Sequence, residues 1–411
     1  MNHAVDIYDL NQSPSALLKL SKENLWSLDE KEMCTISSYF ASDETRAQRT
    51  GLGLPLNPTD CEMEIIAQTW SEHCKHKEFA AKIKLENKDT GETKIVDGLF
   101  ASYIKKSTQV VQKNLVDHGK NWLVKVFSDN AGLVQIDAHR LFAWKVETHN
   151  SPSALDPYGG ALTGIVGNNR DPLGTGVGGA KLLFNTNVLC FAVPSFQGEL
   201  LPGQLHPRKI MTGVCKGIEE GGNKSGIPTI NGAVVFDDRY RGKPLVYCGT
   251  GGVLPALYAG KPADEKPIAA GDFIFMAGGR VGRDGIHGAT FSSLELEEKS
   301  PATAVQIGSP ITQKILSDFL EVACKAGLIK CSTDNGAGGL SSSVGELASL
   351  CGGAVVQLEK VPLKYAGLKP WEIWISESQE RMAVVLAASD VDDFIAAAAL
   401  EIGRASCRER V

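Results

Sequence analysis

The junction between an apolar strand and a glycine-rich segment, within residues 141–179, constrains the fold of this chain more than any other feature. Residues 141–146 form a short, mostly apolar run, which predicts a buried strand. Ser151 followed by Pro152 predicts a helix start, because Ser caps helices and Pro is favoured at the first helical position. A strand that leads into a helix ends at the carboxyl edge of a sheet, where α/β proteins usually bind ligands. We therefore expect an α/β fold with a site at this junction.

Three side chains at the junction carry the chemistry that a ligand site needs. Lys145 can pair with a phosphate, Glu147 can hold Mg²⁺, and His149 can move a proton. A surface loop whose charges are merely solvated is the alternative interpretation.

The glycine-rich segment, residues 158–179, favours the ligand site. Glycine at this density predicts a loop in which backbone amides approach an anion closely. Within it, Arg170 is a phosphate-type donor and Asp171 a magnesium-type ligand. The segment has neither the Walker pattern nor a G-x-G-x-x-G placed directly after a strand, so it belongs to neither common nucleotide-binding family.

Composition limits the class of protein. A chain of 411 residues exceeds a single core, so two domains and an extension are expected. The net charge of −6 argues against a nucleic-acid-binding surface, because phosphate backbones attract basic proteins. No apolar run approaches the ~20 residues that cross a bilayer, so no membrane association is expected. Ten cysteines without a C-x-x-C pair indicate reduced thiols, no zinc cluster and a cytoplasmic location.

The pattern of helices and strands predicts five parts. Residues 273–276, 354–358 and 382–386 read as strands, and residues 312–326 read as a helix. The N-terminal part contains two predicted helices, at 13–20 and 29–40. The predicted parts are a helical extension (1–50), a first α/β domain (51–254), a linker (255–271), a second α/β domain (272–400) and a terminal tail (401–411).

The tail, residues 401–411, changes character abruptly. It resembles the translation of a sequencing-library adapter, and a native basic tail is the alternative. We therefore expect that the natural protein continues beyond residue 400 and that this chain is a fragment.

Residues 71–77 crowd histidine, cysteine and lysine side chains behind a helix that opens with a capping box at Thr59. A buried structural histidine, a His/Cys/His metal site lacking a fourth ligand, and a pocket for negative charge are all compatible with this cluster.

Three further segments are candidates for a strand-edge site. Residues 278–290 interleave glycine with arginine after a strand, as either an anion-binding turn or a tight connection. Asp334 follows the helix at 312–326, as a metal ligand or in an Asx-turn. Residues 377–381 directly precede a strand, so their side chains could converge on its edge.

Cys215 matches the G-x-C-x-G elbow of cysteine-nucleophile glutaminases, but its context differs. The elbow needs a strand before the cysteine. Residues 207–211 start a helix here, and Ile210, Val214 and Ile218 share one helical face. We expect Cys215 to be structural.

Taken together, these motifs resemble the first half of phosphoribosylformylglycinamidine synthases, over roughly residues 50–386. Ser151 stands where that family has a second histidine, and His76 stands where it often has tyrosine. The motifs that carry the resemblance are Ser71–Cys74, Val146–Asn150, Asn169–Pro172, Gly282–Ala289 and Glu377–Glu380.

The resemblance implies a fold and a set of site residues. The fold is an N-type domain followed by an A-type domain of the aminoimidazole-ribotide-synthase-like ATP-binding superfamily. The implied catalytic residues are His73 and His149, and the implied ATP contacts are His76 and Lys145. The implied magnesium ligands are Glu147, Asp171 and Asp334. The implied substrate contacts are Thr148, His149, Asn150, Ser151, Arg170, Gln306, Glu377, Ser378 and Gln379.

The activity implied by the resemblance is the ATP-dependent conversion of formylglycinamide ribonucleotide to its amidine through an iminophosphate. It requires Mg²⁺ and ammonia, which a glutaminase domain or subunit makes from glutamine. The resemblance also implies a second half as partner, without which the chain is expected to be inactive. Two alternatives are another ATP-dependent enzyme of this fold, such as an aminoimidazole ribotide synthase, and a non-catalytic substrate-binding fragment.

Overall fold

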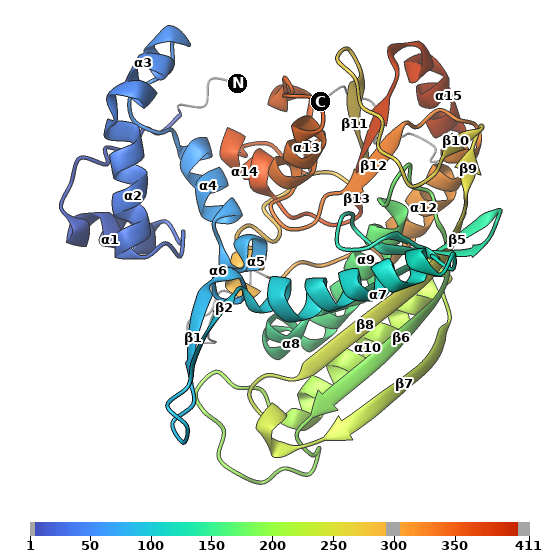
Figure 1. Ribbon diagram of the computed structural model, residues 1–411, viewed down its shortest axis with the longest axis horizontal. Coiled ribbons are helices and arrows are strands. Elements are labelled where there is room, and N and C mark those ends of the chain that lie inside the picture. The colour runs from blue at the N-terminus through green and yellow to red at the C-terminus, as the bar shows by residue number, and fades with distance from the viewer. Residues whose placement is uncertain (1–4, 293–304, 402–411) are drawn as a thin grey trace.

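The computed structural model describes residues 5–292 and 305–401, so the predicted tail beyond residue 401 lies outside the described residues. Two β-sheets and the helices around them form the body of the molecule, and a group of N-terminal helices lies at one side (Figure 1). The predicted α/β fold is confirmed.

The N-terminal helices enclose a small core of their own. Asp29 and Glu32 form a reciprocal capping box at the start of the second helix, where the indole of nearby Trp26 is buried. The predicted helices at 13–20 and 29–40 are confirmed, and the capping box at Thr59 forms as expected. The helices are α1 (Pro14–Glu23), α2 (Glu30–Ala41), α3 (Asp43–Gly51) and α4 (Asp60–Thr69).

The larger sheet has six strands in the order β3-β4-β5-β8-β6-β7, and only the β6–β7 pair is parallel. Its strands are β3 (Leu123–Lys125), β4 (Gly132–Asp137), β5 (Arg140–Thr148), β6 (Lys181–Phe191), β7 (Thr229–Phe236) and β8 (Leu245–Pro255). The helices of this part are α8 (Asn150–Leu155), α9 (Pro157–Leu173), α10 (Pro207–Ser225) and the short η2 (Asp238–Tyr240).

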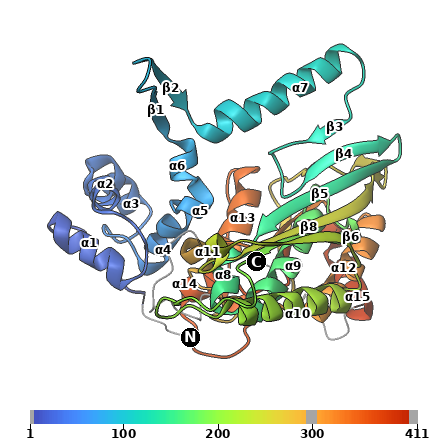
Figure 2. The ribbon, with the colours of Figure 1, turned by 90° about the horizontal axis from the view of Figure 1, so that it is seen from below.

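Helices cover one face of this sheet and leave the other open. α9 and α10 pack on the covered face (Figure 2). Side chains alternate along β5, so Leu141 and Ala143 are buried on the covered face, and Phe142 and Trp144 lie on the open face. Phe142 and Trp144 stack there with ring centroids 6.1 Å apart.

The predicted glycine-rich loop is wrong for most of its length, because the segment forms the buried helix α9. At two of its glycines, the absence of a side chain allows residues of the preceding segment to pack closely against the helix. A Cβ on Gly160 would lie 2.5 Å from the backbone nitrogen of Ser153, and one on Gly164 would lie 3.0 Å from the ring of His149. Close helix packing therefore explains glycine at these positions.

The strand at 141–146 is confirmed within β5, but the predicted helix start is wrong. α8 begins at Asn150, with His149 in the capping position and no side-chain cap. Ser151 instead donates to the carbonyl of Ser292 (3.0 Å). The Ser151 hydroxyl, which the local sequence pattern predicted as a helix cap, therefore bonds to a residue far away in the sequence.

The smaller sheet has three antiparallel strands in the order β11-β13-β12, and its central strand is wholly buried. Alternate residues of that strand face two cores, one under α12 and α15 and one under α13. Its strands are β11 (Phe273–Gly278), β12 (Cys331–Asp334) and β13 (Arg381–Leu386). Its helices are α11 (Gly288–Ser292), α12 (Pro310–Lys325), α13 (Leu340–Ser349), η4 (Leu358–Lys360), α14 (Pro370–Ile375), η5 (Ala388–Asp390) and α15 (Val391–Glu401).

Three of the four elements predicted in this part are confirmed: the strands at 273–276 and 382–386 and the helix at 312–326. The predicted strand at 354–358 is wrong. Residues 353–357 have no regular structure, and a short 3₁₀ helix begins at Leu358. Val355 is 87% exposed, so this segment packs against no neighbouring strand among the described residues, although its composition favours a strand.

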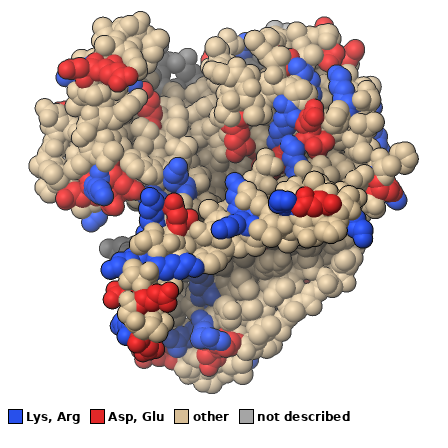
Figure 3. Space-filling model, viewed as in Figure 1, with Lys and Arg blue, Asp and Glu red and all other residues tan. Residues whose placement is uncertain are grey.

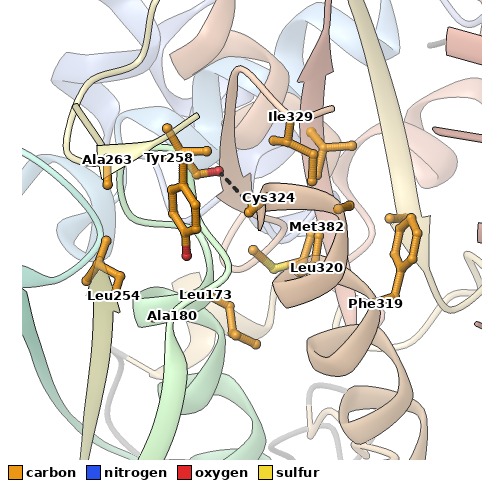
Figure 4. Close-up of a cluster of buried hydrophobic side chains, with 14 of the residues drawn as sticks. Leu173, Ala180, Leu254, Tyr258, Ala263, Phe319, Leu320, Cys324, Ile329 and Met382 are labelled. Atoms are coloured by element: carbon orange, nitrogen blue, oxygen red, sulfur yellow. Dashed lines mark hydrogen bonds between the residues drawn. The ribbon is translucent and has the colours of Figure 1, made fainter. Parts of the chain in front are cut away.

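One apolar core joins the two sheets. Leu173 and Leu254 from the first part pack in one buried cluster with Phe319 and Met382 from the second (Figure 4). Segment 255–271, predicted as a linker, contributes to this cluster and contains β9 (Leu257–Tyr258) and β10 (Lys261–Pro262).

A hairpin and a helix extend away from this body, as Figure 2 shows. α7 buries none of its residues. These elements are α5 (Glu72–Lys75), α6 (Lys77–Ala80), β1 (Lys82–Glu86), β2 (Thr93–Asp97), η1 (Phe100–Lys105) and α7 (Lys106–Asp117). On the face drawn in Figure 3, basic and acidic side chains are interspersed. Among the described residues, no helix is long and apolar enough to cross a membrane.

Cys215 lies in the middle of α10 and is exposed, as expected for a helix and not for a strand-to-helix elbow. Although the residue is exposed, the protein around its sulfur partly excludes water. This desolvation raises the pKa of the Cys215 thiol, which disfavours a thiolate nucleophile.

The shared core predicts a large difference between two substitutions. Phe319→Ala should lower the free energy of unfolding by about 3–5 kcal/mol, because Phe319 is fully buried in the cluster that joins the sheets. Cys215→Ala, the control, should change it by less than about 0.5 kcal/mol. Urea unfolding followed by circular dichroism measures both, and equal midpoints would contradict the assignment of the core.

Candidate active site

A polar cavity of about 450 Å³ lies where the two sheets and α5 meet. The ends of β5 and β12, the start of α8, the buried helix α9 and the residues before β13 all reach it. Its lining residues are His73, Glu147, Thr148, His149, Asn150, Ser151, Pro152, Thr163, Gly167, Arg170, Lys243, Gly288, Ala289, Ser292, Gln306, Asp334, Gly336, Ala337, Glu377 and Gln379.

A lysine between two carboxylates lies beside this cavity. Lys145 Nζ is 2.8 Å from Asp171 Oδ2 and 3.3 Å from Glu147 Oε1. Burial disfavours the charge of Lys145, but Asp171 and Glu147 outweigh it and raise the lysine pKa. Burial likewise acts against the charge of Glu147, and His149 and Lys145 overcome it and lower the pKa of this carboxyl.

Asp171 is the member of this group with excess negative charge around it. Burial raises its pKa well above the usual value, and the nearby carboxylates of Asp334 and Glu147 add to the effect. Lys145 opposes the shift without cancelling it. Asp171 Oδ2 is buried and has the lysine contact but no hydrogen bond in favourable geometry. A further cation at this carboxylate would therefore be stabilising.

Two histidines face this group. His149 Nε2 lies 3.4 Å from Glu147 Oε2 and is buried without a hydrogen bond. Solvent reaches His73, but desolvation by the surrounding protein still lowers its pKa, and His76 and His149 add to the shift while Glu147 opposes it. His73 is therefore held toward its neutral form, in which one ring nitrogen accepts a proton.

A buried chain of polar side chains crosses the cavity from the carboxylates to residues before β13. Arg170 Nη1 donates to Gln379 Oε1, and Arg170 Nε lies 3.4 Å from Asp334 Oδ2. Gln379 Nε2 donates to Gln306 Oε1, and Gln306 Nε2 donates to Glu377. Because each member has a partner, the chain fixes the side-chain orientations at the cavity wall.

Glu377 ends this chain, and its carboxyl group is fully buried. The backbone N–H groups of Ala289 and Gly338 also donate to it, at 3.2 Å and 3.1 Å. Burial raises its pKa to about 7 even though these donors oppose the shift. Burial raises the pKa of neighbouring Glu380 to about 7 as well, against the charge of Arg170.

Four of the residues predicted for the site do not line the cavity. Lys145 and Asp171 lie directly behind Glu147, in the ion-paired group. Ser378 points away and donates to Asp284 Oδ2 (2.6 Å). His76 is exposed between α5 and α6 with φ of 52°. The remaining predicted residues are brought together in the cavity.

Several lining residues were missed by the sequence analysis. Thr163 lines the cavity from within the segment that was predicted as a loop, and it donates to the carbonyl of Gln306 (2.7 Å). Ser292 and Lys243 lie in segments without a recognisable motif. The basic run at 239–243 was the available signal for Lys243.

The predicted magnesium ligands do not form a complete ion site by themselves. In the part of the chain that the structure describes, no group of three or more His, Cys, Asp or Glu side chains could hold a metal ion. Lys145 occupies the space between Glu147 and Asp171, and Asn130 and Arg170 contact Asp334. Assignment of these carboxylates to Mg²⁺ stays a prediction.

The raised pKa values of Glu377 and Glu380 predict how stability depends on pH. Each carboxyl keeps its proton in the folded state from pH 4.5, its usual pKa, to about 7, whereas the unfolded chain loses it. Stability should therefore fall as the pH rises through this range.

Glu377→Gln should reduce this fall, because the amide does not titrate. Urea midpoints at pH 5 and pH 7.5 measure the change. Glu220→Gln is the control, since hydrogen bonds from Lys224 and Tyr158 lower the pKa of Glu220 to about 2, outside the range. The same pH dependence in Glu377→Gln and the unaltered protein would contradict the prediction.

Three protein families match successive parts of the chain. The formylglycinamide ribonucleotide amidotransferase linker domain matches residues 17–77. The AIR synthase related protein N-terminal domain matches residues 128–254, and the corresponding C-terminal domain matches residues 269–406. The N-terminal helices thus belong to the resemblance, which the sequence analysis began only at residue 50.

Individual relatives agree with these families. The chain is 34% identical over 391 residues to the phosphoribosylformylglycinamidine synthase subunit PurL of Thermoplasma volcanium, covering 94% of this chain and 45% of that protein. It is 35% identical over 336 residues to the same subunit of Salinibacter ruber, covering 81% of this chain and 39% of that protein. The chain spans about half the length of the curated relatives it matches.

The chain is also similar in structure to solved PurL proteins. Thermotoga maritima PurL complexed with FGAR has a TM-score of 0.65 and 31% identity, over 87% of this chain and 50% of that one. Its complex with ATP has a TM-score of 0.60 and 30% identity, over 87% and 48%. The chain therefore belongs to the PurL family of phosphoribosylformylglycinamidine synthase subunits.

Proposed function

We propose that this chain supplies the acceptor-binding and proton-transfer part of an ATP-dependent ligase that converts formylglycinamide ribonucleotide (FGAR) to its amidine. The observation that carries the proposal is the cavity itself, where two histidines and the carboxylates of Glu147 and Asp334 face the chain from Arg170 to Glu377. The T. maritima relative is described in complexes with FGAR and with ATP, which supports this choice of substrates.

The polar chain is suited to the amide-bearing end of the substrate. Gln306 and Gln379 present amide groups whose orientation is set by Arg170 and Glu377. Amide side chains donate and accept together, so they match the formylglycinamide group. Their fixed orientation would hold the reacting oxygen in place, which is the main requirement of phosphoryl transfer.

Glu147, Asp171 and Asp334 would hold Mg²⁺ together with the phosphates of ATP, because the three carboxylates form no complete ion site by themselves. Burial, and then the carboxylates of Asp334 and Glu147, raise the pKa of Asp171, and a bound cation would offset both effects. Bound Mg²⁺ would neutralise charge on the transferring phosphoryl group. Lys145, already anchored by two carboxylates, would face the phosphates of ATP.

The proposed reaction proceeds in two steps. The γ-phosphoryl group of ATP passes to the amide oxygen of FGAR, and the amide nitrogen loses its proton, which gives an iminophosphate and ADP. Ammonia then attacks the imine carbon, a proton passes from the added nitrogen to the original amide nitrogen, a second proton leaves the added nitrogen, and the C–O bond to phosphate breaks, which gives the amidine and inorganic phosphate. His149, whose buried Nε2 lacks a hydrogen bond, and His73, held toward its neutral form, would move these protons.

Ammonia would come from a glutaminase domain or subunit. The T. maritima relative occurs in a structure described as PurLQS. Binding assays separate the proposal from its two rivals: an aminoimidazole ribotide synthase-like enzyme would bind the amidine in preference to FGAR, and a binding fragment would bind FGAR without turnover in any longer form.

The ion-paired carboxylate and the unbonded histidine predict different defects in a full-length protein that contains this chain. Glu147→Gln should weaken magnesium-nucleotide binding roughly ten- to hundredfold, because the amide loses the charge that a hard cation prefers. His149→Ala should spare binding and reduce turnover by about two to four orders of magnitude. Unchanged turnover in His149→Ala would remove it from the proton-transfer role.

The 411-residue chain alone should bind FGAR but convert it poorly, because its relatives are about twice as long and displacement of reacting groups by ~1 Å can reduce the rate a hundredfold. Phosphate release with Mg-ATP, FGAR and ammonia measures this activity. Turnover comparable to that of a complete relative would show that the chain is self-sufficient.

A further inference from the structure

Lys243 is a cation at the cavity with no acidic partner among the described residues. It lies between η2 and β8, lines the cavity and is exposed. The other basic residue of the lining, Arg170, is buried, and its guanidinium contacts Gln379 and Asp334. Lys243 is therefore the lining residue whose charge remains free for an anionic part of a ligand.

The other basic residues of the same loop are committed to other contacts. Arg239 donates to the carboxylate of Asp237 at 2.8–2.9 Å, and Arg241 lies over the ring of Phe196, 5.6 Å from its centroid. Neither lines the cavity. The loop thus presents one free ammonium group to the cavity.

Strand register places Lys243 at the far end of the cavity from the ion-paired carboxylates. β5 and β8 run antiparallel, with Lys145 opposite Thr250 and Glu147 opposite Cys248. Pairing continues past the strand ends, where the N–H of His149 donates to the carbonyl of Val246 (2.9 Å).

Asn150 extends this pairing by accepting the N–H of Val246 at its side-chain oxygen (2.9 Å). From Cys248, opposite Glu147, the chain runs back through the start of β8 at Leu245 to Lys243, a span of at most roughly 17 Å at ~3.4 Å per residue. The cavity therefore has an acidic end at Glu147 and Asp334, and a basic end at Lys243.

We propose that Lys243 binds the phosphate monoester of the ribonucleotide substrate. Because the acceptor is a ribonucleotide only under the proposed function, this assignment rests on that function. The reacting amide must lie beside the groups that serve phosphoryl transfer, near Glu147 and His149. The substrate's own phosphate is at the opposite end of the molecule, so it points toward Lys243. A flexible ammonium group suits a phosphate monoester as a point charge.

The inference is tested by titration calorimetry on the whole 411-residue chain with two ligands: FGAR, and the riboside that lacks its phosphate. Lys243→Gln should weaken FGAR binding roughly tenfold, the effect of one partly exposed charged hydrogen bond. It should leave riboside binding unchanged. Lys243→Arg should restore most of the FGAR affinity, because it keeps the charge. Lys261→Gln, an exposed lysine on β10, is the matched control and should bind both ligands normally.

Each other outcome has a definite meaning. FGAR binding that is equal in Lys243→Gln and the control would overturn the assignment, as would an equal loss of FGAR and riboside binding. Mg-ATP, titrated as a third ligand, should bind Lys243→Gln normally, and a loss confined to Mg-ATP would overturn the assignment and place Lys243 with the nucleotide. If the unaltered chain bound the riboside as tightly as FGAR, no phosphate subsite would exist. If it bound neither ligand, the proposed function itself would fail, and this inference with it.

Discussion

The burial of α9 between the two sheets is the constraint on which the rest of the structure depends. This helix contacts β5, β6 and β8 on one side and β12 and α12 on the other. Its C-terminal residue Leu173 enters the shared core, and its last turns carry Arg170 and Asp171 to the cavity. A helix packed this closely on both sides needs small residues, which is why glycine recurs along it. The same helix therefore contributes to the shared core and positions two residues of the candidate site.

Burial also sets the electrostatics of the site. Asp171, Glu147 and Glu377 are charged or acidic groups removed from water, and each is tolerated only because donors or a cation face it. The compensation is unequal: Lys145 and His149 keep Glu147 ionised, whereas Asp171 remains with repulsive neighbours. A cation bound beside Asp171 would offset both its burial and the repulsion from Glu147 and Asp334.

Much of the candidate site could be predicted because its residues follow strands in short motifs. Residues 145–148 end β5 and residues 149–151 follow it, and residues 377–381 lead into β13, so their position at sheet edges followed from apolar patterning. Predictions from local sequence patterns were wrong where contacts with residues far away in the sequence determine the structure. Ser151 bonds to Ser292 instead of capping α8, and residues 353–357 lack a neighbouring strand although their composition favours one. Lys243 belongs to a short basic run without a recognisable motif, and it reaches the cavity because it lies just before β8, which pairs with β5.

The sequence by itself determined the alternation of strands and helices, the family resemblance and most of the polar residues that line the cavity, because these are properties of local patterning and of side-chain type. Only the tertiary structure decided that the glycine-rich segment is a helix, since the space that glycine leaves is filled by Ser153 and His149 from a separate element. It also decided the directions in which the pKa values of the carboxylates shift, because burial and the distances between Lys145, Glu147 and Asp171 depend on how β5 meets α9. Contacts between residues far apart in sequence set both outcomes, and local sequence does not encode them.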